Sequence, residues 1–229
     1  MTERRRKGAD THIAITAYHE AGHAIAALKC GREVITVSVS RDKPGNGLTV
    51  HWRPRRNPYD IIQQPDLTWQ HTRESLLDDI FITLAGPVTE ARKLGRPLRG
   101  IGCTSDYIKC ELLAQRLTVL GEFASHYTDV KPLSIDQLLN GLRLKVNRWV
   151  SRPKNWAQIE AVAGHLQSES SLSINGLTNA ISKGTGEERQ LGFNLNGIDR
   201  KAPKAFKSRK SPHVRKHNGR QRSCSRQTR

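Results

Sequence analysis

The chain lacks long apolar runs and any regular arrangement of cysteines. No stretch approaches the roughly 18 consecutive apolar residues that a membrane-spanning helix requires, and the basic residues 4–7 precede no apolar signal core. The four cysteines show no Cys-x-x-Cys spacing, which argues against a zinc finger and a secreted disulfide scaffold. These absences predict a soluble, cytoplasmic protein without a membrane span.

Acidic residues are missing from residues 200–229, which hold 12 of the 38 Lys and Arg residues. The rest of the chain has 26 basic and 21 acidic residues, so only this end is strongly cationic. Because hydrophobic periodicity stops near residue 184, we expect residues 184–229 to form a disordered, Lys/Arg-rich tail. Two interpretations stay open for residues 200–229: simple solvation, or binding of nucleic acid or an acidic partner.

A His-Glu-x-x-His pattern is present near the start of the chain, formed by His19, Glu20 and His23. At 3.6 residues per helical turn, the two histidines lie on one face and can reach one metal ion, while Glu20 projects beside it. The pattern indicates a zinc hydrolase site, and the alternative is a helix with two surface histidines. The predicted helix runs from residue 11 or 16 to 30, and residues 1–11 are predicted to be a flexible basic arm.

The remaining periodicity predicts a mainly α fold with one β-hairpin. Residues 33–40 and 48–52 alternate apolar and polar side chains around a Pro-Gly-Asn-Gly turn, so they form the hairpin. Its free edge would bind an extended substrate, or the hairpin serves only for packing. A helix from residue 68 is expected to kink or restart at Gly86-Pro87. A further helix is predicted at about 104–120, with a buried stripe formed by Ile108, Leu112, Leu113, Leu117 and Leu120. Three more are predicted at 134–150, 155–167 and 173–182.

The third metal ligand is open at this stage. Asp106 lies in the first turn of a predicted helix, where the positive end of the helix keeps a carboxylate ionised, as a ligand requires. An ordinary first-turn acid would occupy the same position. Glu90 competes, because helix-borne glutamates are ligands in other zinc peptidases.

Several segments, in order, resemble the FtsH-type peptidase domain, the proteolytic half of membrane-bound ATP-dependent zinc proteases. They are residues 17–24, the hairpin 34–52, the Ala-Gly-Pro-Val-Thr-Glu segment 85–90 and the Gly-Cys-Thr-Ser-Asp segment that opens 102–109. The likeness continues from residue 149 to 181 and so covers about 12–182.

The resemblance implies a zincin-like helical peptidase domain over residues 12–183, with the hairpin beside the metal helix. It implies a metalloendopeptidase that acts on unfolded chains, with His19, His23 and Asp106 as Zn²⁺ ligands and Glu20 as general base. It makes Glu90 a residue that supports a ligand rather than a ligand itself.

Two features of that family are missing, since the chain has no Gly-x-x-x-x-Gly-Lys-Ser/Thr phosphate loop and no membrane span. Either a separate ATPase partner unfolds the substrates, or the enzyme is ATP-independent and cuts only flexible polypeptides; oligomerisation is left open. The rival hypothesis is a catalytically idle scaffold that binds nucleic acid or an acidic partner through its tail. Glu20 favours the enzyme, because a scaffold needs no acid between the two histidines.

Overall fold

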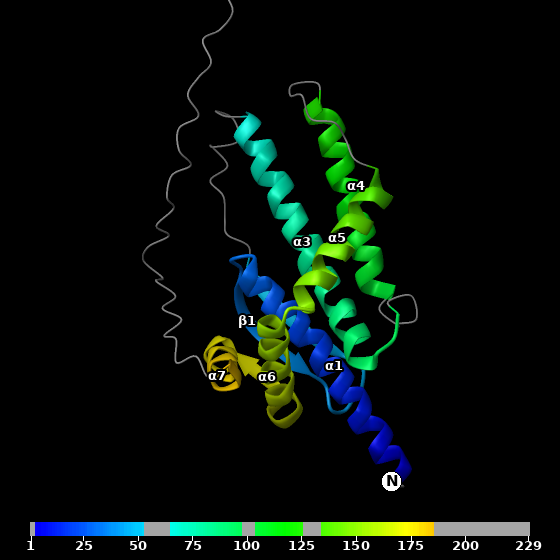
Figure 1. Ribbon diagram of the computed structural model, residues 1–229, viewed down its shortest axis with the longest axis vertical. Helices are drawn as coiled ribbons and strands as arrows, with labels where there is room; N and C mark the ends of the chain where they lie inside the picture. The colour runs from blue at the N-terminus through cyan, green and yellow to red at the C-terminus, as the bar shows by residue number, and fades with distance from the viewer. Residues whose placement is uncertain (1–2, 53–64, 98–103, 126–133, 186–229) are drawn as a thin grey trace, which may run out of the picture. The chain divides into compact units, whose positions relative to one another are not determined.

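A computed structural model describes residues 3–52, 65–97, 104–125 and 134–185 (Figure 1). They belong to the first of the two units into which the chain divides, Met1–Leu191. The described part is mainly helical, as predicted, with one small antiparallel sheet. None of its helices is long and apolar enough to cross a membrane. Almost all of the predicted tail, from residue 186 on, lies outside the described residues.

Helix α1 (Glu3–Lys29) is central to the packing of this unit. It contacts α3 (Pro65–Leu94), α6 (Pro153–Glu169) and the sheet. Small side chains make this possible, because Ala17, Ala21 and Ala24 are fully buried and allow neighbouring backbones to approach closely. Gly31, with a φ of +69°, ends the helix in the left-handed conformation that favours glycine.

The start of α1 differs from the prediction. We expected a flexible arm over residues 1–11, but the helix begins at Glu3. Once a helix is nucleated, each added residue gains a hydrogen bond, and the Glu, Arg, Lys and Ala residues of this segment have high helix propensity. The segment therefore continues the helix although its sequence has no apolar stripe.

The predicted hairpin is confirmed. Strand β1 (Glu33–Val39) pairs antiparallel with β2 (Gly47–Trp52), with Val37 opposite Thr49 and a bulge between Val34 and Thr36. A short third strand that we did not predict, β3 (Ser171–Ser173), pairs with the other edge of β1, which gives the order β2-β1-β3. Within the described residues, β2 is therefore an edge strand of the sheet.

Helix α3 continues through Gly86-Pro87, so of the kink or restart expected there, the restart does not occur. A proline inside a helix costs about 3 kcal/mol. On either side of it, Leu84 and Val88 are each 3% exposed, and burial of such side chains contributes about 1.5–3 kcal/mol apiece. Packing on both sides therefore offsets the cost of Pro87 and holds the helix together.

The remaining helices have the predicted positions. They are α4 (Thr104–Ser125), α5 (Ile135–Val150, capped by the Ser134 hydroxyl), α6 and α7 (Ile174–Thr185). Helix α4 packs on α3 and α5, and α7 packs on α6. Pro153 at the start of α6 needs no amide partner there, which explains why α6 begins two residues before the predicted start.

The buried face of α4 agrees with the prediction only in part. Ile108 and Leu112 were assigned to the buried stripe, but they are 52% and 59% exposed. The buried face carries Leu117, as predicted, together with Cys110 and Ala114. Since α4 has apolar residues on more than one face, periodicity did not decide between them, and the smaller side chains let α3 approach more closely.

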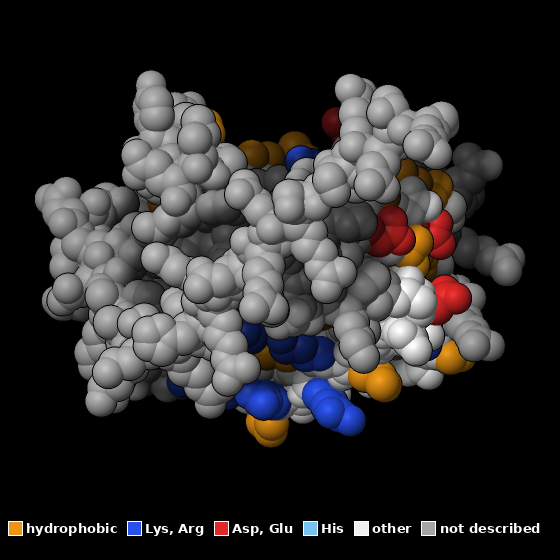
Figure 2. Space-filling model, turned by 90° about the horizontal axis from the view of Figure 1, so that it is seen from above, with side chains coloured by type: hydrophobic (Ala, Val, Ile, Leu, Met, Phe, Trp, Pro, Cys, Tyr) orange, Lys and Arg blue, Asp and Glu red, His pale blue; other side chains and the backbone are white. Residues whose placement is uncertain are grey.

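Charges of both signs share the surface of the described part. On the face seen in Figure 2, Lys and Arg side chains gather along one edge and Asp and Glu side chains along another, with hydrophobic side chains beside both. This agrees with the small net charge of the chain outside residues 200–229.

Candidate metal centre

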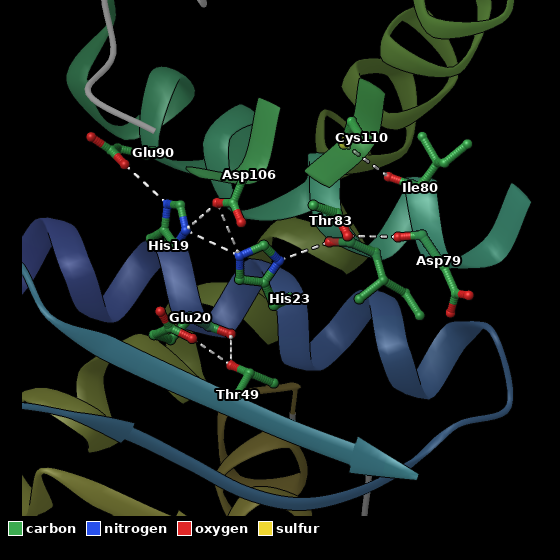
Figure 3. Close-up of polar contacts among 11 residues, drawn as sticks. His19, Glu20, His23, Thr49, Asp79, Ile80, Thr83, Glu90, Asp106 and Cys110 are labelled. Atoms are coloured by element: carbon green, nitrogen blue, oxygen red, sulfur yellow. Dashed lines mark hydrogen bonds and ion pairs between the residues drawn. The ribbon is translucent and has the colours of Figure 1, made fainter. Parts of the chain in front are cut away.

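Helix α1 carries His19 and His23 on one face, one turn apart, as the His-Glu-x-x-His spacing predicts. Figure 3 shows both rings pointing away from the sheet, toward α3 and α4. Their Nε2 atoms lie 3.0 Å apart. The side chains are 15% and 12% exposed, so the pair is largely shielded but can be reached from solvent.

Asp106, in the first turn of α4, completes a cluster of three. Its Oδ2 atom lies 3.0 Å from His19 Nε2 and 3.6 Å from His23 Nε2. Burial opposes ionisation of this carboxyl, but hydrogen bonds and charges of the two histidines outweigh it and hold the pKa of Asp106 below its ordinary range. The structure thus brings together the three residues that the resemblance assigns as ligands.

The Nδ1 atom of each ring has its own hydrogen-bond partner. That partner determines where the Nε2 atom of the same ring points. His23 Nδ1 lies 2.7 Å from the carbonyl oxygen of Ile82, and a carbonyl can only accept, so Nδ1 donates. His19 Nδ1 lies 3.0 Å from Glu90 Oε2. In a neutral ring with a protonated Nδ1, Nε2 carries a lone pair. When both rings are neutral, the two Nε2 lone pairs and the Asp106 carboxylate are three acceptors that converge on one point, whereas protonated rings donate to Asp106 instead.

This arrangement fits a zinc ion. Bonds of about 2.0–2.1 Å in tetrahedral geometry place two ligand atoms roughly 3.3 Å apart. The three ligand atoms here are separated by 3.0, 3.0 and 3.6 Å. Two imidazole nitrogens and one carboxylate oxygen are a donor set that zinc accepts, and three protein ligands leave a fourth position for water or substrate. The residues present are therefore sufficient to hold the metal.

Glu90 lies outside the converging atoms. Its carboxylate, on α3, contacts the Nδ1 atom of His19, on the far side of the ring from Asp106 (Figure 3). A carboxylate in this position fixes the tautomer and orientation of a histidine ligand. Of the two candidates for the third ligand, Asp106 therefore has the geometry of a ligand and Glu90 that of its support.

Glu20 projects from a different face of α1 than the histidines, toward Thr49 of β2 (Figure 3). It is 6% exposed, and its Oε2 atom accepts a hydrogen bond of 2.6 Å from the Thr49 hydroxyl. Glu20 nevertheless lines the same cavity as the three converging residues, a space of about 770 Å³ between α1, β2, α3 and α4. Such a volume is typical of ligand-binding sites.

Two glycines allow the other elements to come this close. A Cβ atom on Gly86 of α3 would lie within 2.8 Å of ring atoms of both His23 and His19. A Cβ atom on Gly47 of β2 would lie 2.5 Å from Glu20 Cγ. Real Cβ atoms do not approach neighbours to these distances, so any other residue at either position would force these side chains or the backbone to shift. Gly86 was interpreted from sequence only as a helix breaker, and Gly47 only as a turn residue.

A second cluster anchors α1 next to His19. Tyr18 stacks on Trp156 of α6 with ring centroids 5.6 Å apart, and the Lys93 ammonium lies 3.0 Å from the Tyr18 hydroxyl. Arg92 lies over the Trp156 ring and donates to the carbonyl oxygen of Val150. These contacts join α1, α3, α5 and α6 and fix the helix that carries the histidines.

Comparison with known proteins gives no independent assignment. No family model matches the chain, and no curated protein matches it.

Proposed function

We propose that the protein is a zinc-dependent endopeptidase that hydrolyses peptide bonds in unfolded or flexible proteins. The observation that carries the proposal is the convergence of His19 Nε2, His23 Nε2 and Asp106 Oδ2 within 3.0–3.6 Å of one another. Glu20, an acid that a purely structural metal site would not need, lines the cavity beside them. The resemblance of residues 12–182 to FtsH-type peptidases supports the same conclusion.

Each residue has a defined part in the proposed mechanism. His19, His23 and Asp106 would hold the zinc ion, which when bound lowers the pKa of a water molecule toward about 7 and polarises a carbonyl oxygen. Glu20 accepts a proton from the attacking water on its carboxylate and transfers it to the leaving amine nitrogen. Glu90 and the Ile82 carbonyl keep the imidazole rings in the required orientation.

The substrate would bind along β2. This strand lines the cavity with Gly47, Leu48 and Thr49, and it is an edge strand within the described part of the chain. Unpaired main-chain groups at such an edge bind the backbone of an extended peptide whatever its side chains. That mode favours unfolded or flexible polypeptides, because a folded protein does not offer a free extended segment.

The test is to purify the chain, measure bound zinc and follow cleavage of a loosely structured casein. Glu20→Gln is the control, because it keeps the size of the side chain but removes the base. We expect zinc in both proteins and cleavage only by the wild type, abolished by a chelator. Equal rates for the two proteins across several unstructured substrates would refute the proposed function.

A further inference from the structure

The carboxylate of Glu20 is enclosed by one strand. Thr49 Oγ1 lies 2.6 Å from Glu20 Oε2 and 3.2 Å from the carbonyl oxygen of Glu20. A hydroxyl has one proton to donate, so the shorter contact is the principal hydrogen bond. Its length is that of a hydrogen bond from a hydroxyl to an ionised oxygen, which is stronger than a bond between neutral groups.

This hydrogen bond compensates an unfavourable burial. Glu20 is 6% exposed, and a buried carboxylate without a partner is costly. Gly47, two residues before Thr49 and thus on the same face of β2, lies directly against the Cγ and Oε1 atoms of Glu20. The strand therefore restricts the side chain by contact at Gly47 and orients it by the hydrogen bond from Thr49.

We propose that Thr49 is the positioning residue for the general base, an inference that rests on the proposed function. Its hydroxyl binds Oε2 and so orients the carboxylate in which Oε1 would accept the proton from water. Threonine suits this task because its β-branch restricts χ1, so the hydroxyl is held in place before substrate binds. Its position on a strand makes the geometry more rigid than a loop would. Because β2 also offers the substrate edge, one strand would align both peptide and base.

The kinetic test compares Thr49→Val, which keeps the shape and removes the hydroxyl, with Thr49→Ser, which keeps the hydroxyl. We expect Thr49→Val to lower kcat by roughly 10–100-fold with little change in KM, because a misplaced base costs rate rather than binding. Thr49→Ser should recover most of kcat. Thr36→Val on β1, a strand threonine that does not line the cavity, is the matched control and should retain wild-type kcat.

A double variant separates positioning from general damage to the fold. If Thr49 acts only through Glu20, adding Thr49→Val to Glu20→Gln should not lower the residual rate further. If Thr49→Val lowers the rate of Glu20→Gln by the same factor as it lowers the rate of the wild type, the proposal is wrong. Should Thr49→Val fold poorly, Thr49→Ala removes the same hydroxyl with less bulk beside the carboxylate.

A measurement without activity completes the test. In metal-free protein labelled with ¹³C at glutamate carboxyls, and with the Glu20 signal assigned from Glu20→Gln, the signal should shift in Thr49→Val but not in Thr36→Val. An unchanged signal would refute the positioning role even if the protein is a zinc peptidase. Equal rates for wild type and Glu20→Gln would instead refute the proposed function, and the role of Thr49 with it.

Discussion

The Nδ1 atom of His19 lies 3.0 Å from the Glu90 carboxylate, a residue 71 positions later in the chain. The contact joins the metal helix α1 to α3 on the side of the ring that faces away from Asp106. It distinguishes Glu90 from Asp106, the two acids that sequence periodicity left as equivalent candidates for the third metal ligand.

Removing Asp106 should abolish zinc binding, whereas removing Glu90 should only weaken it. Asp106→Ala takes away one of the three converging atoms that we propose bind zinc, and Glu90→Ala leaves all three in place. Loss of a residue that orients a histidine ligand typically lowers metal affinity by about 10–100-fold. Competition against a fluorescent zinc chelator measures both effects.

The exposed Glu111 on α4 provides the control for charge, because Glu111→Gln removes an acid that does not line the cavity. Its zinc affinity should equal that of the wild type. If Glu90→Ala loses zinc completely while Asp106→Ala retains it, the prediction is wrong, and Glu90 rather than Asp106 is the ligand.

Gly86→Ala should disrupt the metal centre. The added methyl group would lie within 2.8 Å of ring atoms of both histidines, so the rings or α3 must move. We expect a loss of about 1–3 kcal/mol in the free energy of unfolding, as for overpacked cores, together with weaker zinc binding. Chemical denaturation and the chelator competition measure the two quantities.

Gly141→Ala on α5 is the matched control, since a Cβ atom there would meet nothing within 4 Å. A helical Gly to Ala change at an open position should stabilise the protein by roughly 0.5–1 kcal/mol. Equal behaviour of the two variants would show that α3 does not approach the histidines so closely.

The Cys110 thiol should make stability depend on pH in the alkaline range. Burial, with the nearby charge of Asp106, raises the pKa of Cys110 from 9.0 to about 12. The folded state therefore holds its proton more tightly than the unfolded state. The contribution of this thiol to the free energy of unfolding is fully present below pH 9. It is lost as pH rises from about 9 toward 12.

Over that range the stability difference between wild type and Cys110→Ala should fall by about 1.4 kcal/mol per pH unit. Urea denaturation of both proteins at a series of pH values tests this. A difference that stays constant from pH 8 to 11 would contradict the prediction.

Substrate binding along β2 predicts sensitivity to the peptide backbone rather than to side chains. A substrate peptide N-methylated at alternate amides near the cleaved bond loses hydrogen bonds to the strand edge, so KM should rise roughly tenfold or more. Methylation of the intervening amides removes only N–H groups that point away from the strand edge, so it should have little effect on KM. Equal KM values for both peptides would argue against binding at this edge.

The sequence by itself determined the features that depend on local periodicity. The spacing of His19 and His23 follows from 3.6 residues per turn, and the hairpin follows from alternating side chains around a turn that contains Gly45. Most helices were predicted within a few residues. The start of α1 was not, because its first residues join the helix by propagation from the buried part rather than by a pattern of their own.

Only the tertiary structure decided which residues meet across elements. Asp106 and Glu90 are both helix-borne acids, and their different positions around His19 depend on how α3 and α4 pack on α1. The continuous helix through Pro87 and the choice of buried face on α4 depend on the same packing. The hydrogen bond from Thr49 to Glu20 spans 29 residues and has no local signal. The histidine pair was therefore predictable from helical periodicity, whereas the approach of Asp106 to both rings and the orientation of Glu20 required the packed fold.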